Sequence, residues 1–478
     1  MTDGRASSLS NTGAAPFGRE RERGESFWTR ERAARALASC ARGALPRGSS
    51  RFTGVGTDTR DLAPGALFVA LAGEHFDAHE FLRDAVARGA QAVVVSRPEA
   101  AAGLGVPVYP VTDTLVALGA LANYRRRAWG PRGPVIAIAG SNGKTTTKEL
   151  TRSALASRLE VHATAGNFNN LIGVPLTLLA VPDAADAVVV ELGMNVPGEM
   201  ARLRAIAEPT ITVITCIAEE HLEGLGSIEG VMREESIALD GAQIGVVPAA
   251  QPELVSEARG RVRRLVTAGL GEGDVCAGRW GAAPDGRGWL EVDGVTVRPP
   301  VPGAHNLRNA MLAIAVAREC GIPAADAARG IEGAVIPPMR MAWESLGAAT
   351  LLNDAYNASP ASMRAALDVL GGLAGGRQRV AVLGTMRELG SHAARLHDEI
   401  ARDALATSVD VIAAVGEMAA ALHAAAPADP RLVLAEDLDA LWPHLEPRLA
   451  RDAIILLKAS RGVRLERLVP LLTAWATR

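Results

Sequence analysis

The sequence has 478 residues, with 50 Lys and Arg against 53 Asp and Glu, so its formal net charge is −3. This length exceeds one ordinary hydrophobic core and favours two to four domains. The basic residues are spread along the chain, which argues against a nucleic-acid-binding protein. The four cysteines lie far apart and form no C-x-x-C pair, so we expect neither a zinc site nor a disulfide framework.

The N-terminal segment, residues 1–26, is small, polar and charged, and it lacks the apolar stretch of a signal peptide. It is predicted to be a disordered tail. No uncharged apolar run in the sequence reaches the roughly 18 residues that a membrane span needs. We therefore expect a cytoplasmic protein that does not associate with membranes.

Residues 27–131 are predicted to form a small N-terminal α/β domain, because short apolar strands alternate with helices. The run Gly130-Pro131-Arg132-Gly133-Pro134 marks the linker that ends it. In chain order, its expected strands and helices are 65–71, 79–89, 91–96, 107–111 and 113–128.

Residues 132–336 are predicted to form a central doubly wound domain, because fully apolar strands alternate with helices, as in a parallel sheet covered on both faces. A β-hairpin insertion is expected between about 270 and 300, and a closing helix over 302–320. The expected strands of the sheet are 134–140, 186–192, 210–217 and 244–249.

Beyond a second linker at Pro337-Pro338, residues 337–478 are predicted to form a C-terminal Rossmann-like α/β domain. The predicted fold is therefore three α/β domains with a P-loop ATPase domain at the centre. The expected strands of the third domain are 350–355, 379–384, 409–416, 431–435 and 453–460.

The strongest local signal is PVIAIAGSNGKTTTKEL, in which a buried strand leads into a glycine turn and a helix. Such a turn can bind phosphate through backbone N–H groups, while the lysine neutralises charge and a threonine hydroxyl ligates Mg²⁺. Ile138 stands where the full Walker motif has glycine, so only G-x-x-G-K-T holds; a glycine-rich turn with a chance Lys-Thr is the alternative. The residues predicted to bind nucleotide here are Gly140, Ser141, Asn142, Gly143, Lys144, Thr145 and Thr146.

Two further polar residues follow apolar strands, at the edge where open α/β sheets bind ligands. Glu191 ends the strand over 186–192, and His221 follows the strand over 210–217. We predict that Glu191 binds Mg²⁺ and that His221 lies on the same rim. Taken alone, Glu191 also fits an exposed strand-end acid and His221 a packing or surface histidine.

Several ordered motifs beyond the phosphate loop resemble the Mur ligases, the cell-wall amide ligases related to folylpolyglutamate synthase. The resemblance covers nearly everything from about residue 50 to the end. The motifs that carry it are TDTRDLAPGALFVALAGEHFDAHEF, GNFNNLIGVPLTLL, HLEGLGS, PGAHNLRNA, NDAYNASPASM, VLGTMRELG and LLKASRG.

Within that family, DAYNASP resembles the member that adds D-alanyl-D-alanine, and no D-N-P-R signature of the preceding diamino-acid-adding member is present. The resemblance implies ATP and Mg²⁺ as cofactors, UDP-N-acetylmuramoyl-tripeptide and D-alanyl-D-alanine as substrates, and a monomer. It leaves open whether the third peptide residue is lysine or diaminopimelate.

The resemblance also implies roles for individual residues. Lys144, His221 and Glu235 would be catalytic, with Thr145, Glu191, His221 and Glu235 at the metal. Asn306, Arg340, Asp354 and Asn357 would contact the nucleotide, with Tyr356 on the same wall. The residues that would contact the UDP-peptide or the dipeptide are Thr57, Asp58, Thr59, Arg60, Asn169, Asn170, Lys458, Ser460 and Arg461.

Glu235 departs from the family pattern, in which a lysine is carbamylated to ligate a second Mg²⁺. A glutamate supplies the same pair of anionic oxygens directly, so we hypothesise that Glu235 or adjacent Glu234 replaces the carbamate. The shorter side chain would require a helix shift or a bridging water. The alternative is an ordinary solvated acid on a helix.

The resemblance implies an acyl-phosphate mechanism, in which the substrate carboxylate attacks the γ-phosphate of ATP and the dipeptide amine then displaces phosphate. Phosphoryl transfer of this kind depends on positioning and charge neutralisation. Three alternatives remain at this point: another amide ligase of the same build, an ATP-hydrolysing switch that controls a partner, and an inactive scaffold.

Overall fold

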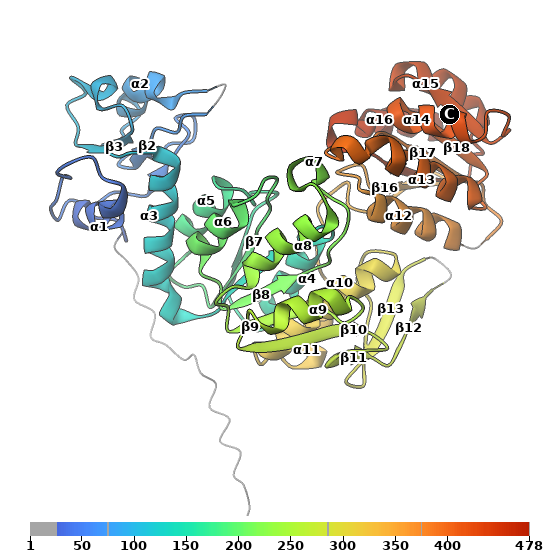
Figure 1. Cartoon of the computed structure of the whole chain (residues 1–478), viewed down its shortest axis with the longest axis horizontal. Helices are drawn as coiled ribbons and strands as arrows, with labels where there is room; N and C mark the ends of the chain where they lie inside the picture. The colour runs from blue at the N-terminus through green and yellow to red at the C-terminus, as the bar shows by residue number, and fades with distance from the viewer. Residues whose placement is uncertain (1–25, 74–75, 284–285, 374, 478) are drawn as a thin grey trace, which may run out of the picture.

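The computed structural model describes residues 26–73, 76–283, 286–373 and 375–477. Residues 1–25 of the predicted tail lie outside them, whereas the last residue of that prediction, Ser26, donates a hydrogen bond to the carbonyl of Phe52. The chain forms three α/β domains arranged in a row, with the central domain between the other two (Figure 1). In the described part of the chain, no helix is long and apolar enough to cross a membrane.

The N-terminal domain is built on a four-stranded parallel sheet in the order β1-β2-β3-β4. β2 and β3 are completely buried, so helices cover both faces of this small sheet. The strands are β1 (Val55–Gly56), β2 (Leu67–Val69), β3 (Ala92–Val95) and β4 (Val108–Pro110), and the helices are α1 (Arg30–Ala36), α2 (Leu82–Ala87) and α3 (Thr114–Trp129).

α3 belongs to the first domain and also packs along α5 (Gly173–Leu179) and α6 (Glu199–Ala207) of the central domain (Figure 1). Two buried arginines attach it there. Arg125 donates to the carbonyl of Val181 at 2.6 Å, and Arg126 donates to that of Ala207 at 2.8 Å. The described contacts therefore join the first two domains along the length of a helix as well as through a linker.

The central domain contains a seven-stranded parallel sheet in the order β11-β10-β9-β8-β5-β7-β6. The doubly wound prediction is confirmed, and the sheet also has β6, β10 and β11, which were not expected. The strands are β5 (Val135–Ala139), β6 (Val161–Ala163), β7 (Ala187–Glu191), β8 (Ile211–Ile214), β9 (Ile244–Pro248), β10 (Arg264–Leu270) and β11 (Val275–Ala277).

Helices cover both faces of this sheet. β5 is accordingly apolar at every position, since both of its faces are buried. Ile136 and Ile138 point into one core with α4 (Lys144–Ala156), α10 (Ala304–Glu319) and α11 (Ala324–Glu332). Alternate residues of the strand point into the other core, with the remaining helices. Those helices are α5, α6, α8 (Ile228–Ser236) and α9 (Pro252–Arg259).

The expected hairpin is a three-stranded antiparallel sheet in the order β12-β13-β14. Its strands are β12 (Arg279–Ala282), β13 (Gly288–Val292) and β14 (Val295–Val297). The predicted closing helix is α10, and α11 follows it before the third domain.

The third domain has a six-stranded sheet in the order β15-β16-β20-β17-β18-β19, in which only β15 runs antiparallel among the described strands. All five predicted strands are confirmed. The strands are β15 (Ala342–Leu346), β16 (Ala349–Asn353), β17 (Arg379–Leu383), β18 (Val411–Val415), β19 (Leu432–Ala435) and β20 (Ile454–Lys458); the helices are α12 (Pro360–Gly372), α13 (Ala393–Ala406), α14 (Gly416–Ala425), α15 (Leu438–Leu445) and α16 (Leu468–Ala476).

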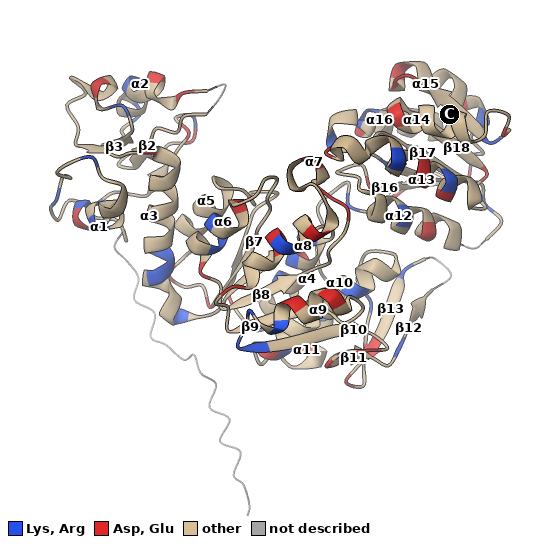
Figure 2. Cartoon of the chain, viewed as in Figure 1, with Lys and Arg blue, Asp and Glu red and all other residues tan. Residues whose placement is uncertain are grey.

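Charged residues of both signs are interspersed over all three domains (Figure 2). In this view no continuous basic stripe runs across the molecule.

Candidate active site

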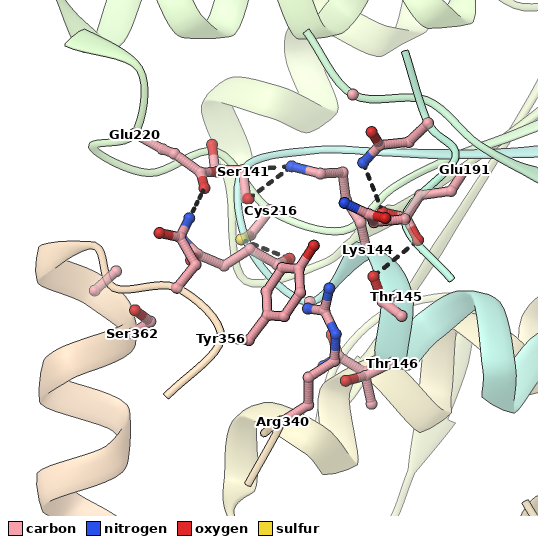
Figure 3. Close-up of a pocket in the computed structure, with 18 of the residues that line it drawn as sticks. Ser141, Lys144, Thr145, Thr146, Glu191, Cys216, Glu220, Arg340, Tyr356 and Ser362 are labelled. Atoms are coloured by element: carbon pink, nitrogen blue, oxygen red, sulfur yellow. Dashed lines mark hydrogen bonds and ion pairs between the residues drawn. The ribbon is translucent and has the colours of Figure 1, made fainter. Parts of the chain in front are cut away.

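A cavity of about 560 Å³ lies where the central and third domains meet. β5 lies between β7 and β8, so the phosphate loop, Glu191 and the turn bearing His221 follow three adjacent strands on one rim. Figure 3 shows the side chains that converge there from both domains. The predicted residues that line the cavity are Ser141, Asn142, Gly143, Lys144, Thr145, Thr146, Asn169, Asn170, Glu191, His221, Asn306, Arg340, Asp354, Tyr356, Asn357 and Lys458.

Two glycines give the phosphate loop its shape. Gly140 has φ +113°, and a Cβ there would lie 2.4 Å from Oγ1 of Thr215. Gly143 has φ +81° and precedes the first residue of α4; a Cβ on it would lie 2.7 Å from Oδ1 of Asn309. A side chain at either position would both strain the backbone and collide with the neighbouring strand or helix.

Lys144 lies folded over its own loop. Its ammonium donates to the carbonyls of Gly140 at 2.6 Å and Ser141 at 2.9 Å, and lies 3.6 Å from Oε2 of Glu220. Burial alone would lower the pKa of Lys144, but the neighbouring carboxylates of Glu220, Glu235 and Glu191 raise it. The lysine therefore stays charged, and its ammonium can exchange these carbonyl partners for phosphate oxygens.

Thr145 and Glu191 place oxygen ligands side by side. The Thr145 hydroxyl donates to Oε2 of Glu191 at 2.8 Å, and the Asn169 amide donates to Oε1 of Glu191 at 2.9 Å. Glu191 is only 1% exposed, so the alternative of an exposed strand-end acid is excluded. A hydroxyl and a carboxylate beside a phosphate loop fit Mg²⁺, which usually takes one or two protein oxygens, substrate phosphates and water.

The Asn170 side chain, unlike that of Asn169, bonds to backbone groups. Its Oδ1 accepts from the backbone N–H groups of Ile172 and Gly173, at the start of α5. The residue lines the cavity, but its side-chain oxygen is engaged by the helix terminus.

Glu235 lies beneath the phosphate loop and does not line the cavity. Its Oε2 accepts from the Gly140 N–H at 2.8 Å, and the side chain is 1% exposed. Burial raises the pKa of Glu235, although the charge of Lys144 and the Gly140 hydrogen bond act in the opposite direction. The alternative of a solvated helix acid is therefore wrong.

Glu234 points away from this region, because its Oε1 accepts from the N–H groups of Gly198 and Met200 at the start of α6. Within the described ranges, no group of three or more His, Cys, Asp or Glu side chains is arranged to hold a metal ion. The four predicted metal ligands therefore form no cage without substrate oxygens.

The rim histidine is held in an unusual backbone conformation. His221 has φ +55°, and its Nδ1 lies 2.6 Å from Oε2 of Glu388 in the third domain. Burial alone would lower the pKa of His221, but the hydrogen bond with Glu388 and the charge of Glu220 raise it. The structure thus assigns the residue to the cavity wall rather than to the surface or to packing.

Glu220 lines the cavity but was not predicted. It is 8% exposed; its Oε1 accepts from the Asn357 amide at 3.3 Å, while its Oε2 faces Lys144. Its place beside His221, at the end of an apolar strand, is the signal that could have identified it.

The third domain supplies the opposite wall through the DAYNASP segment. Lys458 pairs with Oδ2 of Asp354 at 2.7 Å and donates to the carbonyl of Asn357 at 2.7 Å. The Arg340 guanidinium lies 3.9 Å from the centre of the Tyr356 ring (Figure 3). Lys458 thus shapes the wall, and the arginine and tyrosine present one stacked surface.

This wall also touches the phosphate loop directly. Ser359, the N-cap of α12, donates to Oδ1 of Asn142 at 2.9 Å. Ser362 completes a capping box with Ser359 and lines the cavity. These hydroxyls connect the start of a third-domain helix to the loop of the central domain.

Asn306 lies at the start of α10, on the cavity side. Its amide donates to the carbonyl of Pro302 at 2.7 Å, and its Oδ1 accepts from Asn309 at 3.1 Å. Neighbouring His305 also lines the cavity, and burial lowers its pKa to about 4. This end of the cavity therefore presents amide and neutral imidazole groups.

Two predicted contact residues at the end of β20 point elsewhere. Ser460 is 3% exposed and accepts from the Arg387 N–H at 2.9 Å, so its hydroxyl fixes a neighbouring loop. Arg461 pairs with Glu466 at 3.0 Å. Neither residue lines the cavity in this arrangement.

The segment Thr57–Arg60 lies in the N-terminal domain and is separate from the cavity. Asp58 accepts hydrogen bonds from the side chain and backbone of Arg60, which lower its pKa to about 2. The Arg60 side chain is 83% exposed, so its guanidinium is accessible to a ligand.

Lysine is rare in this chain: of the 50 Lys and Arg residues, three are lysines. Lys148 and Lys458 are buried and Lys144 is half-buried. Lys144 and Lys458 line the cavity, whereas Lys148 of α4 donates to the carbonyl of Thr164 at 2.8 Å. A lysine is a compact point charge, unlike the planar fork of arginine. Lys144 and Lys458 thus occupy positions at which a small ammonium fits between close oxygens.

Comparison with known proteins gives one family in all three domains. The Mur ligase middle domain matches residues 138–317, the Mur ligase glutamate ligase domain matches 339–461, and the Mur ligase family catalytic domain matches 51–126.

Relatives that match over nearly their whole length support the same family. The UDP-N-acetylmuramoyl-tripeptide–D-alanyl-D-alanine ligase of Bacillus subtilis is 34% identical, over 92% of this chain and 98% of that protein. The ligase of the same name from Escherichia coli is also 34% identical, over 91% of this chain and 96% of that protein.

Among solved structures, that of MurF from Acinetobacter baumannii is 31% identical, with a TM-score of 0.84, and covers 94% of this chain and 99% of that one. The fold also matches MurF ligase from Thermotoga maritima in complex with ADP, at 24% identity and a TM-score of 0.79, over 90% of this chain and 98% of that one. Sequence, fold and the placement of the phosphate loop against a third-domain wall lead to one conclusion: the chain belongs to the Mur ligase family.

Proposed function

We propose that this enzyme adds D-alanyl-D-alanine to UDP-N-acetylmuramoyl-tripeptide, with ATP hydrolysed to ADP and phosphate, in the synthesis of peptidoglycan precursors. The observation that carries the proposal is the shared cavity, in which Lys144 and the Thr145–Glu191 pair face the DAYNASP wall. The relatives that match over nearly their whole length carry that activity in their names.

The nucleotide phosphates would lie on the glycine loop, at the start of α4, where helix N–H groups favour negative charge. Lys144 would move from the loop carbonyls to the β- and γ-phosphates. Asn306 would contact adenine, and Arg340 with Tyr356 would form the adjoining wall. Asp354 and Asn357 would hold that wall in place through Lys458.

Thr145, Glu191 and His221 would hold Mg²⁺, which would supply charge stabilisation for the transferring phosphoryl group. The terminal carboxylate of the tripeptide would attack the γ-phosphate, and the dipeptide amine would then attack the acyl phosphate. Closure of the third domain about Pro337-Pro338 would exclude water from that intermediate. The UDP end would bind in the first domain at Thr57, Asp58, Thr59 and Arg60.

Glu235 remains our proposed replacement for the carbamylated lysine. We expect Glu235→Ala to lower kcat by about 10- to 100-fold and to raise the Mg²⁺ concentration needed for half-maximal activity, as loss of a ligand or its support does. Steady-state kinetics over a range of Mg²⁺ concentrations measure both effects. Unchanged turnover with an unchanged Mg²⁺ requirement would eliminate this role.

Glu234→Ala is the matched control, because its carboxylate caps α6 through Gly198 and Met200. Loss of this cap should lower the free energy of unfolding by about 0.5–2 kcal/mol. The Mg²⁺ requirement of this variant should match that of the wild type.

The proposed reaction is tested with ATP, Mg²⁺, each UDP-tripeptide and D-alanyl-D-alanine, with ¹⁸O in the terminal carboxylate of the peptide. We expect a UDP-pentapeptide by mass and one ¹⁸O atom in the released phosphate, because that oxygen leaves with the phosphoryl group. Unlabelled phosphate would rule out the acyl-phosphate route. Phosphate release without either co-substrate would instead favour the ATP-hydrolysing switch.

A further inference from the structure

The loop after β17 docks on the turn that carries His221. The backbone carbonyl of Glu388 accepts from the Glu223 N–H at 3.1 Å, and Nε2 of His392 lies 3.1 Å from the carbonyl oxygen of Gly226. Between them, Gly390 packs so closely that a Cβ would lie 3.0 Å from Cα of Glu223. The contact thus extends along both segments and does not depend on one ion pair.

Within this contact, the Glu388 side chain reaches His221 from outside the cavity. Its Oε2 lies 2.6 Å from Nδ1 of His221, whereas the Glu388 side chain is 53% exposed and does not line the cavity. Glu388 also has φ +63°, so both residues of the pair hold left-handed backbone conformations. Such conformations persist where surrounding contacts enforce them and are common at functional sites.

The hydrogen bond determines which ring nitrogen faces the cavity. A carboxylate accepting from Nδ1–H keeps that proton on Nδ1 and leaves the Nε2 lone pair available. Nε2 lies 3.9 Å from Oε1 of Glu220, beyond hydrogen-bonding distance. His221 therefore presents an unprotonated nitrogen to the site when its ring is neutral.

We propose that Glu388 is a positioning residue, which orients His221 and fixes its tautomer from the third domain, so that the rim of the central domain is complete only when the two domains are docked. The inference deepens the proposed function and rests on it for the reaction to be measured. It assigns to the third domain a task beyond forming the wall of the cavity, since docking delivers the carboxylate that the histidine requires.

The tautomer is measured directly by ¹⁵N NMR of histidine-labelled, metal-free enzyme at a pH at which the imidazole is neutral. His221→Gln identifies the signal among the nine histidines. We expect the wild type to show Nδ1–H, Glu388→Ala to lose this preference, and Glu388→Gln to keep it because the amide oxygen can accept the same proton. Retention of the Nδ1–H form in Glu388→Ala would overturn the proposal.

Kinetics provide the second readout. We expect Glu388→Ala to lower kcat by about 10- to 100-fold, the usual effect of losing the carboxylate behind a ligating histidine, with KM for the UDP-peptide changed less than about threefold. Glu388→Gln should recover most of kcat, and Glu436→Ala, at an exposed acid of the same domain, should resemble the wild type. Equal losses in the alanine and glutamine variants, with lowered melting temperatures, would show a purely structural contact and overturn the assignment.

The two hypotheses can fail separately. If the wild type forms no UDP-pentapeptide, the proposed function fails, while the ¹⁵N signals still decide whether Glu388 sets the tautomer. If the product forms but Glu388→Ala leaves both tautomer and kcat unchanged, the positioning role alone is lost.

Discussion

Replacing Lys144 by methionine is expected to lower kcat by about 10²–10³-fold, the effect of removing one preorganised group that stabilises developing charge. The ammonium lies 2.6 Å from the Gly140 carbonyl, within reach of phosphates bound to the same loop. Without it, three nearby carboxylates would face the triphosphate with less compensating charge. Single-turnover conversion of bound ATP to ADP, measured after rapid quenching, isolates phosphoryl transfer from product release.

The variant Lys144→Arg distinguishes the contribution of the positive charge from that of the side-chain shape. The guanidinium retains the charge, but its planar fork does not fit the point contacts that the ammonium makes with two loop carbonyls. We therefore expect a loss close to that of the methionine variant. Arg152→Ala, on the exposed side of the same helix, is the matched control and should keep nearly full activity. A wild-type rate of ATP conversion in Lys144→Met would remove the lysine from the mechanism.

The second large effect concerns the stability of the third domain. Asp354→Ala leaves the Lys458 ammonium, whose side chain is 3% exposed, without its carboxylate. Breaking a buried pair in this way costs about 3–5 kcal/mol. We expect calorimetry to show the transition of the third domain at a clearly lower temperature, with activity lost because Lys458 also holds the Asn357 carbonyl.

The double variant Asp354→Ala/Lys458→Met tests the cause, since removing both charges leaves no unpaired ion. It should recover most of the lost stability but not the activity. Asp439→Ala breaks an exposed pair with Arg467 in the same domain and should cost at most about 1 kcal/mol. If the single and double variants unfold alike, an uncompensated charge is not the reason for the loss.

Most of the strands that the sequence predicted correctly are uniformly buried and apolar, although β4 and β19 are only partly buried. β5, β7 and β18 are buried at every residue, and such runs can be recognised without knowledge of their neighbours. The unpredicted strands are shorter or only partly buried. β6 is half-buried at every residue and β15 at most residues, so neither shows a strong hydrophobic periodicity. The domain boundaries at 131/132 and 336/337 stay predictions.

Residues of the site were predictable where one short segment contains the whole chemical pattern. The phosphate loop is of this kind, because its glycines, Lys144 and Thr145 are adjacent in sequence. Glu388 and His221 are 167 residues apart, and no local spacing connects them. For Ser460 the resemblance implied a ligand contact, which stays a prediction; in the structure its hydroxyl accepts from the Arg387 backbone N–H.

The attachment of α3 has a mechanical consequence for the whole enzyme. Arg125 and Arg126 bind its last turns to carbonyls of the central domain, so these two domains resist rotation against each other. The proposed closure would then bend the chain mainly at the linker before the third domain. A substrate bound at its nucleotide end by the first domain, as proposed, would rest on a rigid support, and the proposed closure of the third domain would act at its reactive end.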